Sequence, residues 1–144
     1  MEIKRIGILE KEAFSSTIIP GIYCIDLSAP IAVQYEVSGD CNLECIFCYN
    51  VWKDENVSTS MSMTLSSEKR WQVIEKIISL DIFEVILSGG EPLFVPEICK
   101  IVFRFAEENI KTYLITNGTL LTKDMAYRLK ESGLEGIQIS LHGS

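Results

Sequence analysis

A regular alternation of strand-like and helix-like segments begins at Ile31 and continues to the end of the 144-residue chain. β-Branched and aromatic residues dominate four short runs, and stretches with apolar residues at helical spacing separate them. The predicted strands are Ile31–Val37, Phe83–Leu87, Thr112–Ile115 and Ile137–Leu141. Because strands that are joined through helices pair in parallel, this order predicts an α/β fold of right-handed βαβ units.

Three helices are expected between these strands, and their ends are predicted from capping residues. Thr64 is the candidate N-cap of the first helix, and Pro96 suits the first turn of the second. Thr122 is the candidate N-cap of the third helix, and Gly133 suits its C-terminal stop. The apolar residues expected to face the core are Trp71, Ile74, Ile77 and Ile78, then Ile98, Ile101, Val102 and Phe105, and finally Met125 and Leu129.

Each predicted strand is followed by, or ends in, a group of polar or cysteine residues. A cysteine cluster follows the first strand, Gly-Gly-Glu-Pro the second and Thr-Asn-Gly the third, while Ser140 ends the fourth. In parallel α/β folds, ligands bind at the C-terminal ends of the strands. The sequence therefore predicts that all four groups contribute to one binding site.

The cysteine cluster has the spacing C-x-x-x-C-x-x-C, formed by Cys41, Cys45 and Cys48. Four thiolates saturate a [4Fe–4S] cluster, whereas three leave one iron open for another ligand. A zinc site is the alternative, but a structural zinc site takes four protein ligands. The nearest spare donors, which have no finger-like spacing, are Cys24, Cys99 and His142. Apolar residues inside the cysteine run are expected to shield a cluster from water, namely Leu43, Ile46 and Phe47.

With these motifs in this order, the segment from about Ile31 to Ser144 resembles the core of the radical S-adenosylmethionine (SAM) superfamily. The resemblance rests on the cysteine run, on Gly89-Gly-Glu-Pro, on Thr116-Asn-Gly and on Ile139-Ser-Leu-His-Gly. The Cys-Asn-Leu opening and the Cys48-Tyr49 pair are most similar to PqqE-like and sulfatase-maturing enzymes. That branch modifies peptides and proteins.

The resemblance implies the N-terminal part of a partial (β/α)6, TIM-like barrel that uses two cofactors, a [4Fe–4S] cluster and SAM. In the family, SAM chelates the open iron. Transfer of one electron to SAM then cleaves SAM to methionine and a 5′-deoxyadenosyl radical. The implied enzyme is a radical SAM oxidoreductase or maturase, with no catalytic residue assigned. Its implied partners are a reductant such as flavodoxin or ferredoxin and an unidentified substrate, with a peptide as the candidate.

The resemblance also implies cofactor contacts at the strand ends. Gly89 and Gly90 let the backbone approach a ligand closely, and their carbonyls, together with Glu91, are expected to accept hydrogen bonds from the SAM amino group. The backbone of Phe47 is expected at the adenine edge, with its ring near the cluster. The alternatives are a plain strand-to-loop turn at the glycines and ordinary core packing for Phe47.

Three further residues have two interpretations each. Ser140 is expected either to hydrogen-bond the SAM ribose or carboxylate or to line the barrel. Asn117 either orients the adenosyl end or serves only the turn with Gly118. Tyr49 either packs near the cluster or fills the core. Cys24 and Cys99 are expected to be small apolar residues.

The amino-acid composition limits which partners and which cellular compartment are expected for this chain. The net charge of −7 argues against non-specific nucleic-acid or acidic-membrane binding, and no apolar run approaches a membrane span of about 18 residues. The odd number of cysteines, five, and the absence of a signal-like N-terminus favour a reducing cytoplasm. We therefore expect a cytoplasmic protein with no nucleic-acid or membrane partner.

Two parts are expected along the chain: a leader with short strands at residues 1–30, and the first four strands of the radical SAM core at residues 31–144. Because the motif pattern stops just past the fourth strand, we expect the chain to be truncated. Two alternatives to an enzyme remain at this point. One is a non-catalytic Fe–S electron-transfer or metal-binding module, and the other is a truncated, inactive product.

Overall fold

The structure is a computed structural model and describes residues 29–49 and 64–141. In this part of the chain, strands and helices alternate. The strands are β1 (Ala32–Ser38), β2 (Glu84–Gly89), β3 (Lys111–Thr116) and β4 (Gly136–Ile139). The helices are α1 (Ser67–Ile78), α2 (Ile98–Glu107) and α3 (Lys123–Glu131), with a short 3-10 helix, η2 (Pro92–Phe94), after β2.

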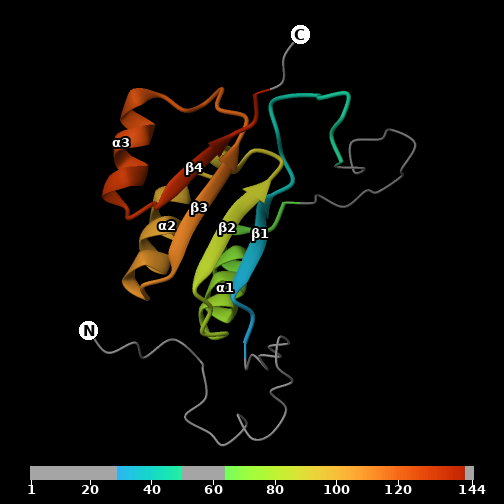
Figure 1. Cartoon of the computed structure of the whole chain (residues 1–144). Coiled ribbons are helices and arrows are strands. Elements are labelled where there is room, and N and C mark those ends of the chain that lie inside the picture. The colour runs from blue at the N-terminus through green and yellow to red at the C-terminus, as the bar shows by residue number, and fades with distance from the viewer. Residues whose placement is uncertain (1–28, 50–63, 142–144) are drawn as a thin grey trace, which may run out of the picture.

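The four strands form one parallel sheet in the order β1-β2-β3-β4. Val33 lies opposite Val85, Val85 opposite Thr112, and Leu114 opposite Ile137. All strands end at the same edge of the sheet, which is the upper edge in Figure 1, and the helices lie behind the sheet. The α/β fold class predicted from the sequence is confirmed, with parallel βα units of the kind that build TIM-like barrels.

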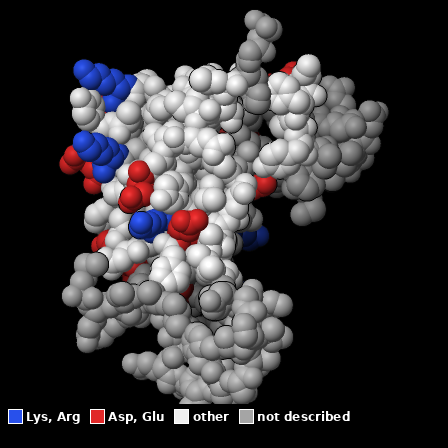
Figure 2. Space-filling model, in the orientation of Figure 1, with Lys and Arg blue, Asp and Glu red and all other residues white. Residues whose placement is uncertain are grey.

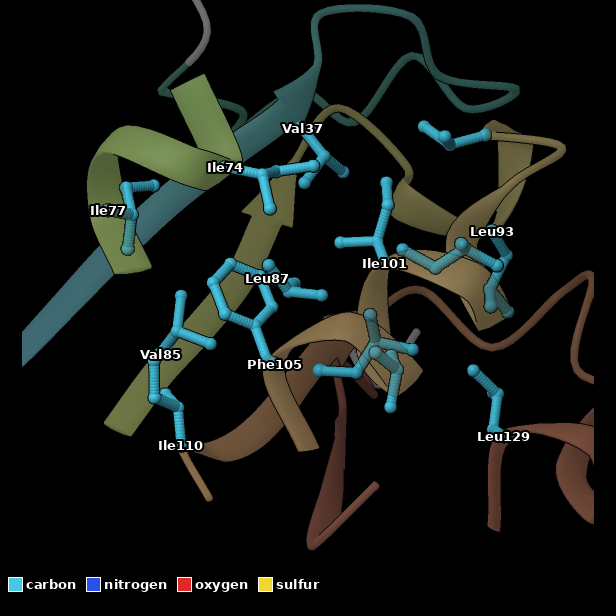
Figure 3. Packing of buried hydrophobic residues seen from close by; sticks show 14 of the residues in the cluster. Val37, Ile74, Ile77, Val85, Leu87, Leu93, Ile101, Phe105, Ile110 and Leu129 are labelled. Carbon is cyan, nitrogen blue, oxygen red and sulfur yellow. The ribbon is translucent and has the colours of Figure 1, made fainter. Parts of the chain in front are cut away.

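The hydrophobic core lies between the sheet and the helices. Val85 and Leu87 of β2 point toward Ile74 of α1 and toward Ile101 and Phe105 of α2, and all five are completely buried (Figure 3). Burial of one such side chain contributes about 1.5–3 kcal/mol to stability. The predicted core-facing residues of α1 and α2 are confirmed, because Ile74, Ile77, Ile98, Ile101, Val102 and Phe105 are buried and Trp71 and Ile78 pack against them.

The N-terminus of α1 differs from the prediction. The N-cap is Ser66, whose hydroxyl oxygen accepts a hydrogen bond from the backbone nitrogen of Lys69 at 3.4 Å. The hydroxyl of Thr64 instead donates to the Oδ2 atom of Asp40 at 2.7 Å. The prediction of Thr64 as the cap was therefore wrong, because its hydroxyl is used by a residue distant in the sequence.

The predicted ends of α3 are confirmed, whereas the predicted start of α2 is not. Thr122 caps α3, accepting from the backbone nitrogen of Met125 at 3.1 Å, and Gly133 has a φ of +89° directly after the C-cap of that helix, so both predictions are confirmed. Pro96, by contrast, precedes Glu97, the N-cap of α2, so it lies outside the first turn. The preceding η2 helix, which the sequence analysis missed, sets the entry into α2.

The predicted leader at residues 1–30 falls almost wholly outside the described residues, as do Cys24 and His142. β4 ends at Ile139, so Ser140 and Leu141 follow the strand and do not belong to it. No described helix combines the length and the apolar character that crossing a membrane requires.

Candidate functional site

The three clustered cysteines lie on the loop that leaves the C-terminal end of β1. We call residues 39–49 the cysteine loop. Cys41 and Cys45 are partly buried and Cys48 is exposed, and none of the three is in a disulfide. The backbone nitrogen of Cys48 donates to the carbonyl of Cys45 at 3.0 Å, which closes a turn between the last two cysteines. In Figure 1, this loop rises above the upper ends of the strands.

The turn after β2 packs directly against the start of the cysteine loop. The backbone nitrogen of Gly90 donates to the Ser38 carbonyl, and that of Glu91 donates to the Asp40 carbonyl, each at 2.7 Å. A Cβ atom on Gly89 would lie 2.3 Å from the Ser38 oxygen, and one on Gly90 would lie 2.3 Å from the Asp40 oxygen. The structure thus gives a reason for both glycines that the sequence did not show, because two backbone segments of the chain itself meet there.

Glu91 joins the turn after β2 to the end of β3. Its side chain is fully buried. The Oε1 atom accepts from the Leu93 nitrogen at 3.0 Å and from the Thr116 hydroxyl at 2.6 Å, while Oε2 accepts from the Asn117 nitrogen at 2.9 Å. Because each carboxylate oxygen has a partner, the burial of this charge is compensated by hydrogen bonds.

Asn117 joins the end of β3 to the cysteine loop. Its side-chain nitrogen donates to the Oδ1 atom of Asn42 at 2.9 Å and to the Sγ atom of Cys41 at 3.7 Å. The Cys41 sulfur also accepts from the backbone nitrogen of Leu43 at 3.5 Å. Three of the predicted site regions, which follow β1, β2 and β3, are therefore connected by hydrogen bonds.

The remaining predicted site residues lie at the margin of this arrangement. Ser140 is partly buried just past β4, and its backbone nitrogen donates to the Thr116 carbonyl at 2.9 Å. The side chains of Phe47 and Tyr49 are 55% and 68% exposed, so core packing, the alternative for both, is excluded. Ile46 is also fully exposed.

The helix-free face of the sheet carries polar side chains close to the cysteine loop. Gln34 donates to the Ser88 hydroxyl at 3.0 Å across β1 and β2. The Tyr49 hydroxyl donates to Glu36 at 2.9 Å. This hydrogen bond is the main cause that raises the pKa of Tyr49, and burial is the second. In Figure 2, uncharged residues cover most of the upper part of this face, and charged side chains lie mainly at its left and lower parts, with a few at the right and upper right.

Arg70 is an important residue of the site that the sequence analysis missed. It is 5% exposed, and its guanidinium donates to the carbonyls of Val37 and Leu65 at 3.1 and 3.0 Å and to Glu97 at 2.6 Å. It therefore fixes the end of β1, from which the cysteine loop departs. A signal was present, because Arg70 precedes the buried Ile74 by one helical turn and lies on the same face.

The ion pair of Arg70 with Glu97 connects α1 to the start of α2. Burial raises the pKa of Glu97, but hydrogen bonds from Ser67 and Arg70 and the Arg70 charge lower it by more, so its net pKa is below the ordinary value. The side chain of Glu97 is 18% exposed. The charged form of Glu97 is therefore stabilised in the folded protein.

The donor chemistry of the cysteine loop fits an iron–sulfur cluster better than a single metal ion. Within the described residues, no three His, Cys, Asp or Glu side chains converge on one point where an ion would bind. In a cubane cluster each thiolate binds a different iron, so the three sulfurs lie around the cluster and do not meet at one point. The loop carries three free thiols, which are donors of the type that an iron–sulfur cluster takes, and two N–H groups are directed at the Cys41 sulfur.

Comparison with known proteins identifies the family. The profile of the Radical SAM superfamily matches residues 35–144, and the chain belongs to this superfamily. The resemblance inferred from the motifs is thereby confirmed. The family association brings with it SAM and an iron–sulfur cluster as the expected cofactors.

The names of individual relatives point to different activities. Fe-coproporphyrin III synthase of Methanosarcina barkeri is 32% identical over 77% of this chain and 27% of its own length. PqqA peptide cyclase of Rhodopseudomonas palustris is 30% identical over 80% of this chain and 29% of its own length. The structure of Streptococcus suis SuiB bound to precursor peptide SuiA is 26% identical with a TM-score of 0.54, over 72% of this chain and 22% of that one. The chain thus spans less than a third of these relatives.

Proposed function

We propose that this chain binds a [4Fe–4S] cluster through Cys41, Cys45 and Cys48 and SAM beside it, and that it initiates radical chemistry on a peptide or protein. The observation that carries the proposal is the hydrogen-bonded connection of the cysteine loop to the turns after β2 and β3. This connection supports the proposal, because the loop that carries the three free thiols is bonded through Asp40, Cys41 and Asn42 to the turns after β2 and β3.

The residues around the cysteines would bind and orient the cofactors. When bound, the reduced cluster supplies the electron for reductive cleavage of SAM. Glu91 is buried with its oxygens occupied, so we assign the contact with the SAM amino group to the backbone carbonyls of Gly89 and Gly90 and the support of that turn to Glu91. Phe47, Asn117 and Ser140 remain the proposed neighbours of the adenosyl part.

The proposed partners follow from this chemistry. A low-potential one-electron donor such as flavodoxin or ferredoxin would reduce the cluster. A peptide substrate is supported by the similarity to PqqA peptide cyclase and to SuiB, and by the Cys48-Tyr49 pair. Incubation of the loaded protein with a short peptide encoded beside its gene, followed by mass spectrometry, tests the substrate. A heme precursor or a nucleotide modified in its place would overturn the peptide proposal.

The cofactor proposal is tested by anaerobic reconstitution with iron and sulfide. We expect roughly four irons per chain and loss of cluster in Cys41→Ala, Cys45→Ala and Cys48→Ala, because each thiolate holds one iron. Cys99→Ala is the matched control, since Cys99 is a free, partly buried cysteine that belongs to α2 and not to the cysteine loop. Stoichiometric zinc without iron would instead support the metal-binding module.

Binding of SAM is tested on the same reduced sample. We expect SAM to change the electron paramagnetic resonance spectrum, because the open iron acquires new ligands, and dithionite-driven 5′-deoxyadenosine to accumulate. A cluster whose spectrum ignores SAM would support an electron-transfer module. A spectrum that responds without 5′-deoxyadenosine would support an inactive product that still binds both cofactors.

A further inference from the structure

The orientation of the Asn117 side-chain amide is fixed by a hydrogen bond from the backbone of Thr119. Its Oδ1 atom accepts from the backbone nitrogen of Thr119 at 2.9 Å, and a backbone N–H group can only donate. The Nδ2 atom must therefore lie on the opposite side of the amide, which faces the cysteine loop. The backbone nitrogen of Asn117 is held as well, by Glu91 at 2.9 Å.

The two hydrogens of this Nδ2 atom have separate acceptors. One is Asn42 Oδ1 at 2.9 Å, and the other is the Cys41 sulfur at 3.7 Å. The Asn42 amide donates in turn to the Thr119 hydroxyl at 2.8 Å, which donates back to Asn117 Oδ1 at 2.6 Å. We call Asn42, Asn117 and Thr119 the amide ring, because each side chain donates to the next without a conflict of donors or acceptors.

The amide ring holds a polar N–H group against a cluster ligand before any cofactor binds. Two N–H groups, from Leu43 and Asn117, reach the Cys41 sulfur. An N–H group stabilises negative charge on a thiolate, and hydrogen bonds to the sulfurs help to set the potential of an iron–sulfur cluster. One-electron reduction adds negative charge to the cluster and its ligands, so such a donor favours the reduced state.

We propose that Asn117 is a positioning residue that raises the reduction potential of the cluster by donating its side-chain N–H to Cys41. This inference rests on the proposed function, because it requires the cluster to be bound. It differs from a role in the Asn117-Gly118 turn, which the backbone and Oδ1 contacts of Asn117 already serve. It also gives Asn117 an effect that is present without SAM.

The test compares the midpoint potentials of reconstituted wild type, Asn117→Leu and Asn117→Asp without SAM. Leu removes the donor without adding charge, whereas Asp keeps the Oδ1 acceptor for Thr119 and loses the N–H. We expect both variants to keep their iron and to shift to a more negative potential. The equilibrium constant for reduction should fall up to about tenfold, which corresponds to about 59 mV for one electron.

Thr119→Val is the matched control. It removes the hydroxyl from the amide ring but keeps the backbone N–H that orients Asn117, so we expect a smaller shift than in either Asn117 variant. Resonance Raman spectra of the Fe–S vibrations provide a second readout, because the deuterium shift of wild type should decrease in both Asn117 variants.

The possible outcomes separate this inference from the proposed function. Failure of wild type to take up iron would overturn both. Wild-type uptake with equal potentials in all four proteins would overturn the inference alone. Loss of the cluster from both Asn117 variants, but not from Thr119→Val, would also overturn it, because Asn117 would then be needed for assembly and not for the potential.

Discussion

The two loops that meet at the site are organised in opposite ways. In the turn after β2, Glu91 is fully buried and both its backbone and its carboxylate are hydrogen-bonded. In the outer half of the cysteine loop, Ile46 is fully exposed and Phe47 is 55% exposed. The chain thus builds one wall of the site from its own contacts and leaves apolar side chains of the other wall facing solvent.

This difference indicates where cofactor binding has to contribute. The first part of the cysteine loop, up to Leu43, is attached to the turns after β2 and β3 through Asp40, Cys41 and Asn42. The outer part closes a local turn between Cys45 and Cys48, and its last residue, Tyr49, is bonded to Glu36 of β1. We therefore expect the wall formed by β2 and β3 to determine the stability of the chain, and the outer cysteine loop to matter once a cluster is bound.

The largest expected effect is that of Glu91→Ala. The substitution leaves the Leu93 nitrogen, the Thr116 hydroxyl and the Asn117 nitrogen without their acceptor at a buried position. We expect the free energy of unfolding, measured with urea, to fall by roughly 3 kcal/mol or more. Glu91→Gln should have an intermediate effect, because its amide keeps one oxygen as an acceptor but presents an N–H group where the other carboxylate oxygen accepted a hydrogen bond.

Glu44→Ala is the matched control for this prediction. Glu44 is an exposed glutamate in the cysteine loop, so its removal should change the free energy of unfolding by no more than about 0.5 kcal/mol. Equal losses in Glu91→Ala and Glu44→Ala would contradict the comparison between the two walls.

The difference between the two walls also explains how far the sequence alone could lead. The alternation of strands and helices, the parallel pairing, the core faces of α1 and α2 and the convergence of motifs at one edge followed from local patterns and from the rules of parallel sheets. The hydrogen bonds of Glu91 with Thr116 and of Asn117 with Cys41 could not be predicted in this way, because they join residues that are 25 and 76 positions apart in the sequence. The close contacts of Gly89 and Gly90 with the backbone of Ser38 and Asp40 were missed for the same reason, since no local pattern shows which backbone will lie against a glycine.

A smaller effect is expected from the ion pair below the site. Glu97 has a lowered pKa in the folded protein, so it stabilises the fold above its unfolded pKa, and this contribution is lost as the pH falls through the folded pKa. We expect the stability of wild type to decrease as the pH is lowered from about 5 to 3. Urea unfolding across this range should show a flatter dependence for Glu97→Gln. An unchanged slope in that variant would show that Arg70 does not stabilise the charged form of Glu97.

The smallest effect on stability, and the most direct test of the exposed wall, is that of Phe47→Ser. Without a cluster, we expect its free energy of unfolding to stay within about 0.5 kcal/mol of wild type, because half of the ring is already in water. After reconstitution, the same substitution should speed the loss of cluster absorbance in air, since apolar side chains near a cluster limit solvent access. Phe103→Ser is the control, because Phe103 on α2 is 53% exposed and lies away from the cysteine loop. Equal bleaching of the two variants would mean that Phe47 does not shield the cluster. A large loss of stability in cluster-free Phe47→Ser would show that the outer cysteine loop is already part of the folded wall.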